Sequence, residues 1–151
     1  MTEPVLEPGS TLGVLGGGQL GAMFTGAAHR MGYQVAVWDQ DADAPAHRLA
    51  THSFTAPFSD LGARDQFASL VDAVTLEWEN VPAVLCEWLE MRRSMRPAGA
   101  VLKILQDRIE QKQYLLSRHL SVPAFAIVES ASQLVSAVDR LGLPAVCKTA
   151  K

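Results

Sequence analysis

The stretch from Thr11 to Met23 constrains the fold of this chain more than any other. Its first five residues predict a buried strand, and Gly16, Gly18 and Gly21 have the G-x-G-x-x-G spacing that joins a strand to a helix. Glycine lets the backbone turn tightly and lets an anionic ligand approach the peptide groups. The N-terminus of the following helix favours phosphate, because its N–H groups are unpaired and partly positive. The stretch therefore predicts either a phosphate-binding turn or a tight turn without a ligand.

The composition is typical of a well-packed soluble domain. The chain has 151 residues, 48% of them hydrophobic and 19% charged, which suits one domain or one domain and part of another. A net charge of −3 gives no electrostatic basis for binding nucleic acid or a membrane surface, and no apolar run is long enough to span a bilayer. Residues 1–10 contain two glutamates, two prolines and no basic residue, so we expect a disordered tail and not a signal peptide.

The cysteines and histidines predict neither a disulfide nor a metal site. Cys86 and Cys147 lie far apart in apolar surroundings, so we expect both to be small core side chains in a reducing cytoplasm. The four histidines show no ligand spacing with cysteine or carboxylate residues, which argues against zinc.

The glycine turn opens a β-α-β unit, which predicts a parallel sheet. The helix begins near Gln19, and Leu20, Phe24, Ala27 and Met31 form an apolar stripe that we expect to face the sheet. Gly32 is expected to end this helix, and residues 34–38 form the second strand. Asp39 follows that strand at the position where nicotinamide-binding folds hold a ribose hydroxyl, but an acidic run of this kind is usually only a solvated turn.

Two carboxylates follow the next strong strand. Residues 44–59 are weakly patterned, with a short helix over 46–50 and a short strand over 53–56, and a helix is expected over 60–71. Residues 74–76 continue as a buried strand, and alternation places Glu77 and Glu79 on one face at its carboxyl end. Ligands of open α/β sheets bind at such ends, although a solvated strand end is the alternative. Asn80 is expected to cap the helix that contains Leu85 and Trp88.

The remainder of the chain predicts a second unit. Residues 96–99 mark a boundary, and Asp107 has capping spacing to Glu110 at the start of a helix. Arg108 in the first turn opposes the helix dipole, which an adjacent anion would explain. Strands over 122–128 and 143–148 flank a helix, which forms a β-α-β unit with an unfinished sheet. We therefore expect a second domain that continues past Lys151.

Five segments, in order from residue 12 to residue 149, resemble the 5-(carboxyamino)imidazole ribonucleotide synthase family of the ATP-grasp superfamily. The chain is similar to this family in the glycine string ending at Met23, in a T-x-E-x-E-N-V-P segment over 75–82 and in a Q-D-R-x-x-Q-K helix over 106–112. Two strands, around Val122 and Leu143, match the start of the nucleotide-grasping domain.

The resemblance implies an α/β fold with a Rossmann-like parallel-sheet domain over 11–96, linking helices over 97–120 and the beginning of an ATP-grasp domain over 121–151. It also implies ATP-dependent carboxylation of aminoimidazole ribonucleotide with bicarbonate, in a cytoplasmic homodimer that uses Mg²⁺. Arg108 and Lys148 would contact ATP. The residues that would face the ribonucleotide are Gly16, Gly17, Gly18, Gln19, Leu20, Glu77 and Glu79.

Two departures from the family pattern bear on activity. Ala22 stands where many relatives carry arginine, and the phosphate-covering loop and the magnesium carboxylates are expected beyond Lys151. The 151-residue chain alone is therefore expected to be inactive. Three alternatives stay open: another ATP-grasp ligase of the glycinamide ribonucleotide transformylase or biotin carboxylase type, an NAD-dependent dehydrogenase, and a non-catalytic nucleotide-binding or dimerisation module.

Overall fold

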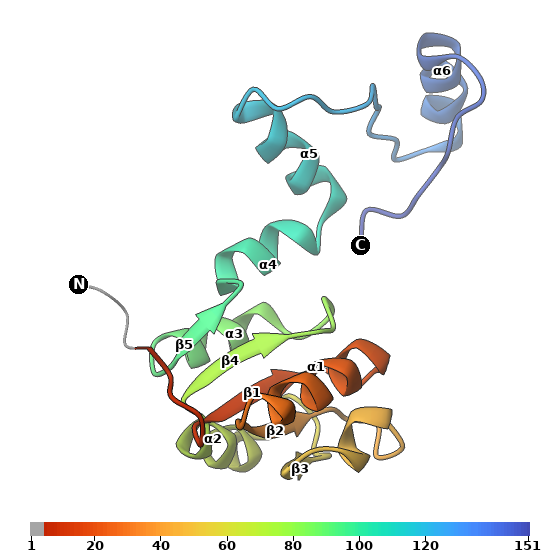
Figure 1. The fold of residues 1–151 in the computed structure, drawn as a ribbon. Coiled ribbons are helices and arrows are strands. Elements are labelled where there is room, and N and C mark those ends of the chain that lie inside the picture. Colours follow the sequence, from red (N-terminus) through yellow and green to blue (C-terminus); the bar gives the residue numbers. More distant parts are fainter. Residues whose placement is uncertain (1–4) are drawn as a thin grey trace. The chain divides into compact units, whose positions relative to one another are not determined.

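The computed structural model describes residues 5–151 and confirms the expected α/β fold with a parallel sheet (Figure 1). Five strands pair in the order β3-β2-β1-β4-β5, and every pair is parallel. After β1, the chain adds β2 and then β3 on one side of it. It then crosses over and adds β4 and β5 on the other side of β1. The strands are β1 Thr11–Leu15, β2 Gln34–Trp38, β3 His52–Phe54, β4 Ala73–Leu76 and β5 Ser94–Arg96.

The chain divides into two compact units, one up to Leu102 and one from Lys103 to Lys151. The sheet lies entirely in the first unit. None of the helices formed by residues 5–151 is both long enough and apolar enough to cross a lipid bilayer. The helices are α1 Gln19–Arg30, the 3₁₀ helix η1 Pro45–Arg48, α2 Leu61–Leu70, α3 Ala83–Glu90, α4 Gly99–Leu105, α5 Arg108–Ser117 and α6 Ala131–Leu141.

Strand alternation divides the core of the first unit into two layers. Val35 and Val37 of β2 pack with residues of α1 and η1, whereas Ala36 and Trp38 pack with residues of α2 and α3. Helices therefore cover both faces of the sheet, α1 on one and α2 with α3 on the other. Trp38 anchors the second layer. It is fully buried, contacts Phe67 with a tilted ring at 5.4 Å between centroids and donates its indole N–H to the Ala56 carbonyl at 2.7 Å.

The prediction for the buried face of α1 is wrong. Leu20 and Met31, which were expected to face the sheet, are 64% and 65% exposed. The buried residues of the helix are Gly21, Thr25 and Ala28, which share the same helical spacing. Small side chains let the helix approach the sheet closely, so the helix packs on these residues and its larger apolar side chains face outward.

Two local predictions near α3 are also wrong. Asn80 lies in an exposed turn and Pro82 precedes the first helical residue, so no side chain caps α3. The strand β5 follows α3, where the sequence predicted no strand and only a boundary over residues 96–99. It pairs with β4 through residues 94–96, and Met95 is fully buried in the core. A three-residue strand with one buried side chain carries too little periodicity to be recognised.

The expected tail over residues 1–10 falls partly outside the described residues, which begin at Val5. Within the described part, Gly9 N donates to the Gly32 carbonyl at 2.8 Å, and the Tyr33 hydroxyl donates to the Leu6 carbonyl at 2.9 Å. The chain from Leu6 onward is thus hydrogen-bonded to the turn between α1 and β2. Gly32 itself has a φ of +87°, as expected for a residue that ends a helix.

The second unit contains helices α5 and α6, and no strand follows β5 up to Lys151. The strands expected over 122–128 and 143–148 are therefore wrong for this chain, because neither segment has a hydrogen-bonded neighbour within the described residues. The large apolar side chains in and after α5 are also largely exposed, with Leu116 at 48% and Leu120 at 53%. The expected cap at Asp107 is confirmed, since its side chain accepts from Ile109 N at 2.9 Å, and Ser130 caps α6 by accepting from Gln133 N at 3.3 Å.

The two cysteines differ in environment, which gives the first prediction. Cys86 is fully buried, and burial raises the pKa of its thiol to about 11, whereas Cys147 is exposed and not in a core. Because the thiolate is the reacting species, one thiol per native chain should react rapidly with a disulfide reagent at pH 8 and the second only in denaturant. Substitution Cys147→Ser should remove the rapid phase, and equal rates for both thiols in the native chain would contradict this assignment.

Candidate functional site

Three residues that follow neighbouring strands stand side by side at the carboxyl edge of the sheet. Leu15 pairs in register with both Trp38 and Leu76, the last residues of β2 and β4. The next residues along the chain are Gly16, Asp39 and Glu77. Because the chain leaves β1 toward β2 and later returns to β4 on its other side, this edge is the switch point where open α/β sheets bind ligands.

The glycines of the turn are required by the protein's own packing. A Cβ on Gly16 would lie 2.8 Å from the Trp78 Cβ, and the residue has a φ of +101°. A Cβ on Gly17 would lie 2.9 Å from the Ala44 Cβ, and one on Gly21 would lie 2.8 Å from the Gly16 carbonyl oxygen. The bare backbone at these three positions therefore has a structural cause that needs no ligand.

Gly18 lies against the carboxylate of Glu77, which supplies all three of the atoms nearest to it and also comes close to Gly16. A Cβ on Gly18 would lie 3.0 Å from Glu77 Oε1. Gly18 also precedes the first residue of α1, no side chain among the described residues caps this end, and the first turn holds no acidic residue. Glu77 thus places a negative charge beside the positive end of the helix. The Glu77 carboxylate can accept a hydrogen bond from a hydroxyl or an amine, and the helix N-terminus can bind an anionic group.

Asp39 serves the turn itself. Its Oδ2 accepts a hydrogen bond from Gly17 N at 2.6 Å, and its Oδ1 accepts one from Asp41 N at 2.8 Å. A carboxylate that holds two backbone N–H groups fixes the glycine turn against β2. This arrangement favours a structural role for Asp39 over the ribose contact that a dehydrogenase would need.

A hollow of about 240 Å³ opens next to the turn. It brings together two of the predicted residues, Leu20 and Glu77, but not Glu79, which lies in the exposed turn after Trp78. Gln19 is exposed as the first residue of α1. Four further residues line the hollow that the sequence did not indicate for a site: Val14, Phe24, Thr75 and Leu76.

Ala22, the departure from the family pattern, lies one turn into α1. It is half-buried and packs against the cluster that contains Val14 and Val35. A long charged side chain at this position would have to leave that apolar contact, so alanine suits the packing seen here.

The second unit holds the predicted cations, both of them exposed. Arg108 is the first residue of α5, and its backbone N–H donates to the Ala150 carbonyl at 2.8 Å. Lys148 stands two residues before Ala150, a separation of about 7 Å in extended chain. Lys151, at the end of the same segment, forms an exposed ion pair with the N-cap residue Asp107 at 3.7 Å. The segment around Lys148 therefore runs beside the start of α5.

A family model described as the ribonucleotide synthetase preATP-grasp domain matches residues 10–106, which include the whole sheet and the glycine turn. The chain belongs to this family. The family model stops at residue 106, directly after α4, whereas the sequence similarity to a single relative covers all 151 residues.

Relatives and solved structures agree in the activity that they name. The chain is 35% identical over 151 residues to an N5-carboxyaminoimidazole ribonucleotide synthase of Bacillus subtilis, covering 100% of this chain and 40% of that protein. An N5-carboxyaminoimidazole ribonucleotide synthetase solved as an ADP complex matches 95% of this chain with 33% identity and a TM-score of 0.87, over 38% of its own length. A synthase of Aspergillus clavatus, solved with ADP and 5-aminoimidazole ribonucleotide, matches 91% of this chain with 29% identity and a TM-score of 0.76. The chain thus spans about 40% of the length of the B. subtilis relative.

Proposed function

We propose that the complete protein is an ATP-dependent carbon–nitrogen ligase of purine biosynthesis. ATP phosphorylates bicarbonate to carboxyphosphate with release of ADP. The carboxyphosphate breaks down to CO₂ and phosphate, and the exocyclic amine of aminoimidazole ribonucleotide takes up the CO₂. The observation that carries this proposal is 35% identity to a synthase of this name over all 151 residues, through both units of the chain.

The ribonucleotide binds at the switch point of the first unit in this proposal. Gly16, Gly17 and Gly18 form the floor, and the uncapped start of α1 at Gln19 and Leu20 faces the phosphate. The Glu77 carboxylate, next to Gly18 and on the wall of the 240 Å³ hollow, accepts from a ribose hydroxyl or the amine, with Glu79 beyond it. Geometry favours Glu77 over Glu79 for this contact, because Glu79 does not line the hollow.

ATP phosphates bind to Arg108 and Lys148 of the second unit in this proposal. The backbone bond between Arg108 and Ala150 keeps the two cationic residues in one region of that unit. A cation in the first turn of a helix is unfavourable because of the helix dipole. A bound ATP phosphate next to Arg108 would offset this cost. A lysine offers a compact ammonium to phosphate oxygens.

Magnesium does not fit this stretch of chain. Within residues 5–151 there is no group of three His, Cys, Asp or Glu side chains that could hold a metal ion. We therefore expect the Mg²⁺ ligands, with the phosphate-covering loop, to come from other residues of the complete protein. We further propose that residues 97–120 form linking helices and that residues 121–151 begin an ATP-grasp domain. The complete protein is proposed to be a cytoplasmic homodimer.

The proposal is tested by ADP release from the complete protein. We expect release to need bicarbonate and aminoimidazole ribonucleotide together, because uncoupled formation of carboxyphosphate would waste ATP. Release that ignores the ribonucleotide would overturn the substrate assignment. Stimulation by glycinamide ribonucleotide with formate, or by biotin, would instead assign one of the other ATP-grasp ligase activities.

A further inference from the structure

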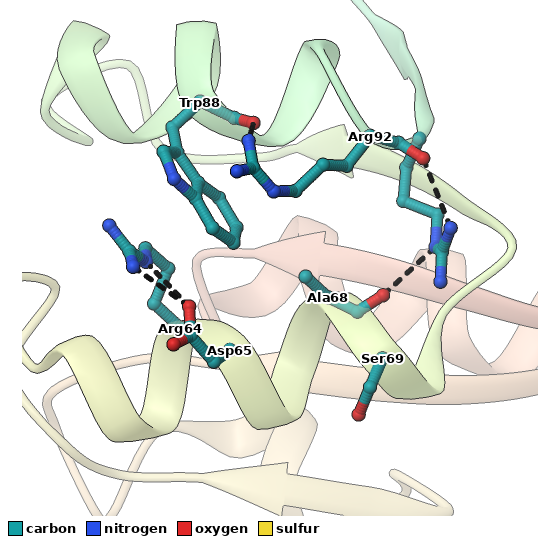
Figure 2. A pocket seen from close by; sticks show the side chains of 7 residues that line it. Arg64, Asp65, Ala68, Ser69, Trp88 and Arg92 are labelled. Atoms are coloured by element: carbon teal, nitrogen blue, oxygen red, sulfur yellow. Dashed lines mark hydrogen bonds and ion pairs between the residues drawn. The ribbon is translucent and has the colours of Figure 1, made fainter.

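A second and larger hollow, of about 470 Å³, lies between α2 and the end of α3 (Figure 2). It is formed on the face of the sheet that α2 and α3 cover, whereas the glycine turn leads into α1 on the other face. Three arginines line it, Arg64, Arg92 and Arg93, together with one acid, Asp65. Arg64 forms an ion pair with Asp65 at 2.8 Å, so the net positive charge of the wall comes from Arg92 and Arg93, in a chain whose net charge is −3.

The guanidinium groups of this hollow are held in place. Arg64 and Arg92 lie on opposite sides of the Trp88 indole, with Cζ atoms 3.8 Å and 3.7 Å from the ring centroid (Figure 2). Arg93 Nε donates to the Ala68 carbonyl at 2.9 Å, and Arg92 donates to the Trp88 carbonyl at 3.1 Å. These stacking contacts and hydrogen bonds already restrict the arginine rotamers before a ligand binds. Binding a ligand therefore costs less side-chain entropy.

Most donors of the three groups have no partner within residues 5–151. A guanidinium has five N–H donors, and Arg92 directs one of them to a carbonyl. Arg93 directs two N–H groups to carbonyls, and Arg64 directs two to the Asp65 carboxylate. Planar guanidinium groups with free, fixed donors match the oxygens of a phosphate group bidentately, which ammonium groups do not.

We propose that the hollow lined by Arg64, Trp88, Arg92 and Arg93 binds a small phosphate-bearing ligand, as a site separate from the glycine turn. Its volume, about 470 Å³, is within the range of small-molecule pockets. Since both faces of the Trp88 ring are covered by guanidinium groups, the phosphate and not a stacked base provides recognition. This inference does not depend on the proposed ligase activity.

The test titrates inorganic phosphate and, separately, AMP into the 151-residue chain and follows the indole N–H signal of Trp88 by NMR, assigned with Trp88→Phe. We expect a saturable shift of this signal, weakened about tenfold or more in Arg92→Ala and in part in Arg92→Lys, which keeps the charge but loses the planar fork. Arg30→Ala, an exposed cation of α1, removes the same charge and should leave the shift unchanged.

The two probes distinguish the sources of the phosphate group. Tighter binding of AMP than of inorganic phosphate supports a nucleotide ligand, and equal binding supports free phosphate. Adenosine, which lacks the phosphate group, should not shift the Trp88 signal in either case. The proposal is overturned if neither probe gives a saturable Trp88 shift, or if Arg92→Ala and Arg30→Ala weaken the shift equally. Circular dichroism of each variant keeps loss of folding separate from loss of binding.

Discussion

Replacing Gly16 by alanine should cost about 3 kcal/mol of unfolding free energy, from a left-handed backbone at a residue with a Cβ and from overpacking. The new Cβ would lie 2.8 Å from the Trp78 Cβ and 2.9 Å from the Trp78 backbone nitrogen. That nitrogen is anchored, because Glu77 and Trp78 both direct their N–H groups to the Leu15 carbonyl. The backbone therefore cannot move aside without opening the contact between β1 and β4.

Gly26→Ala is the matched control for this substitution. It adds the same methyl group within α1, where the nearest atom is the end of the Arg30 side chain at 3.8 Å. We expect it to stabilise the chain by about 0.5–1 kcal/mol, the usual gain in a helix interior. Urea unfolding followed by tryptophan fluorescence reports on the first unit alone, since Trp38, Trp78 and Trp88 all lie there. Equal midpoints for the two variants would contradict the turn geometry.

Replacing Lys148 by alanine should raise the KM for ATP of the complete protein by about ten- to a hundredfold, the effect of removing one charge-assisted bond to phosphate. The stability of the chain should stay nearly unchanged, because Lys148 is exposed. Steady-state ADP release at saturating bicarbonate and ribonucleotide measures this effect.

Lys151→Ala provides the control in the same segment. It removes the same charge three residues away, but its ammonium is paired with Asp107 and its side chain is 80% exposed. Loss of such an exposed pair is expected to cost at most about 1 kcal/mol of stability and to leave the KM for ATP unchanged. An unchanged KM in Lys148→Ala, or an equal rise in both variants, would remove Lys148 from the ATP site.

The sequence predicted the elements that have strong local signals. The buried strands β1, β2 and β4, the start of α1 after the glycines and the end of α1 at Gly32 are all confirmed. Two apolar stripes share the spacing of α1, and only contact with the sheet selects the smaller residues as the buried ones. The strands expected in the second unit depended on neighbours that residues 5–151 do not supply, so local pattern alone misjudged them.

The candidate site was predictable in position but not in detail. Glycines after one strand and a glutamate after another are expected to meet wherever two parallel strands pair, and Gly18 and Glu77 do so. The bond between Asp39 and Gly17 depends on the register of β1 with β2, which no local pattern encodes. The same holds for the roles of Phe24 and Thr75 in the hollow. The ligand contacts of Arg108 and Lys148 stay predictions.

In the proposed function the two units serve different substrates, the ribonucleotide at Glu77 and ATP at Lys148. The most direct test measures both KM values in Glu77→Gln and Lys148→Ala of the complete protein. We expect Glu77→Gln to raise the KM for aminoimidazole ribonucleotide about tenfold and leave that for ATP unchanged, with the reverse pattern in Lys148→Ala. If both variants raise the same KM, or if neither value changes, the assignment of the ribonucleotide to Glu77 and of ATP to Lys148 is wrong.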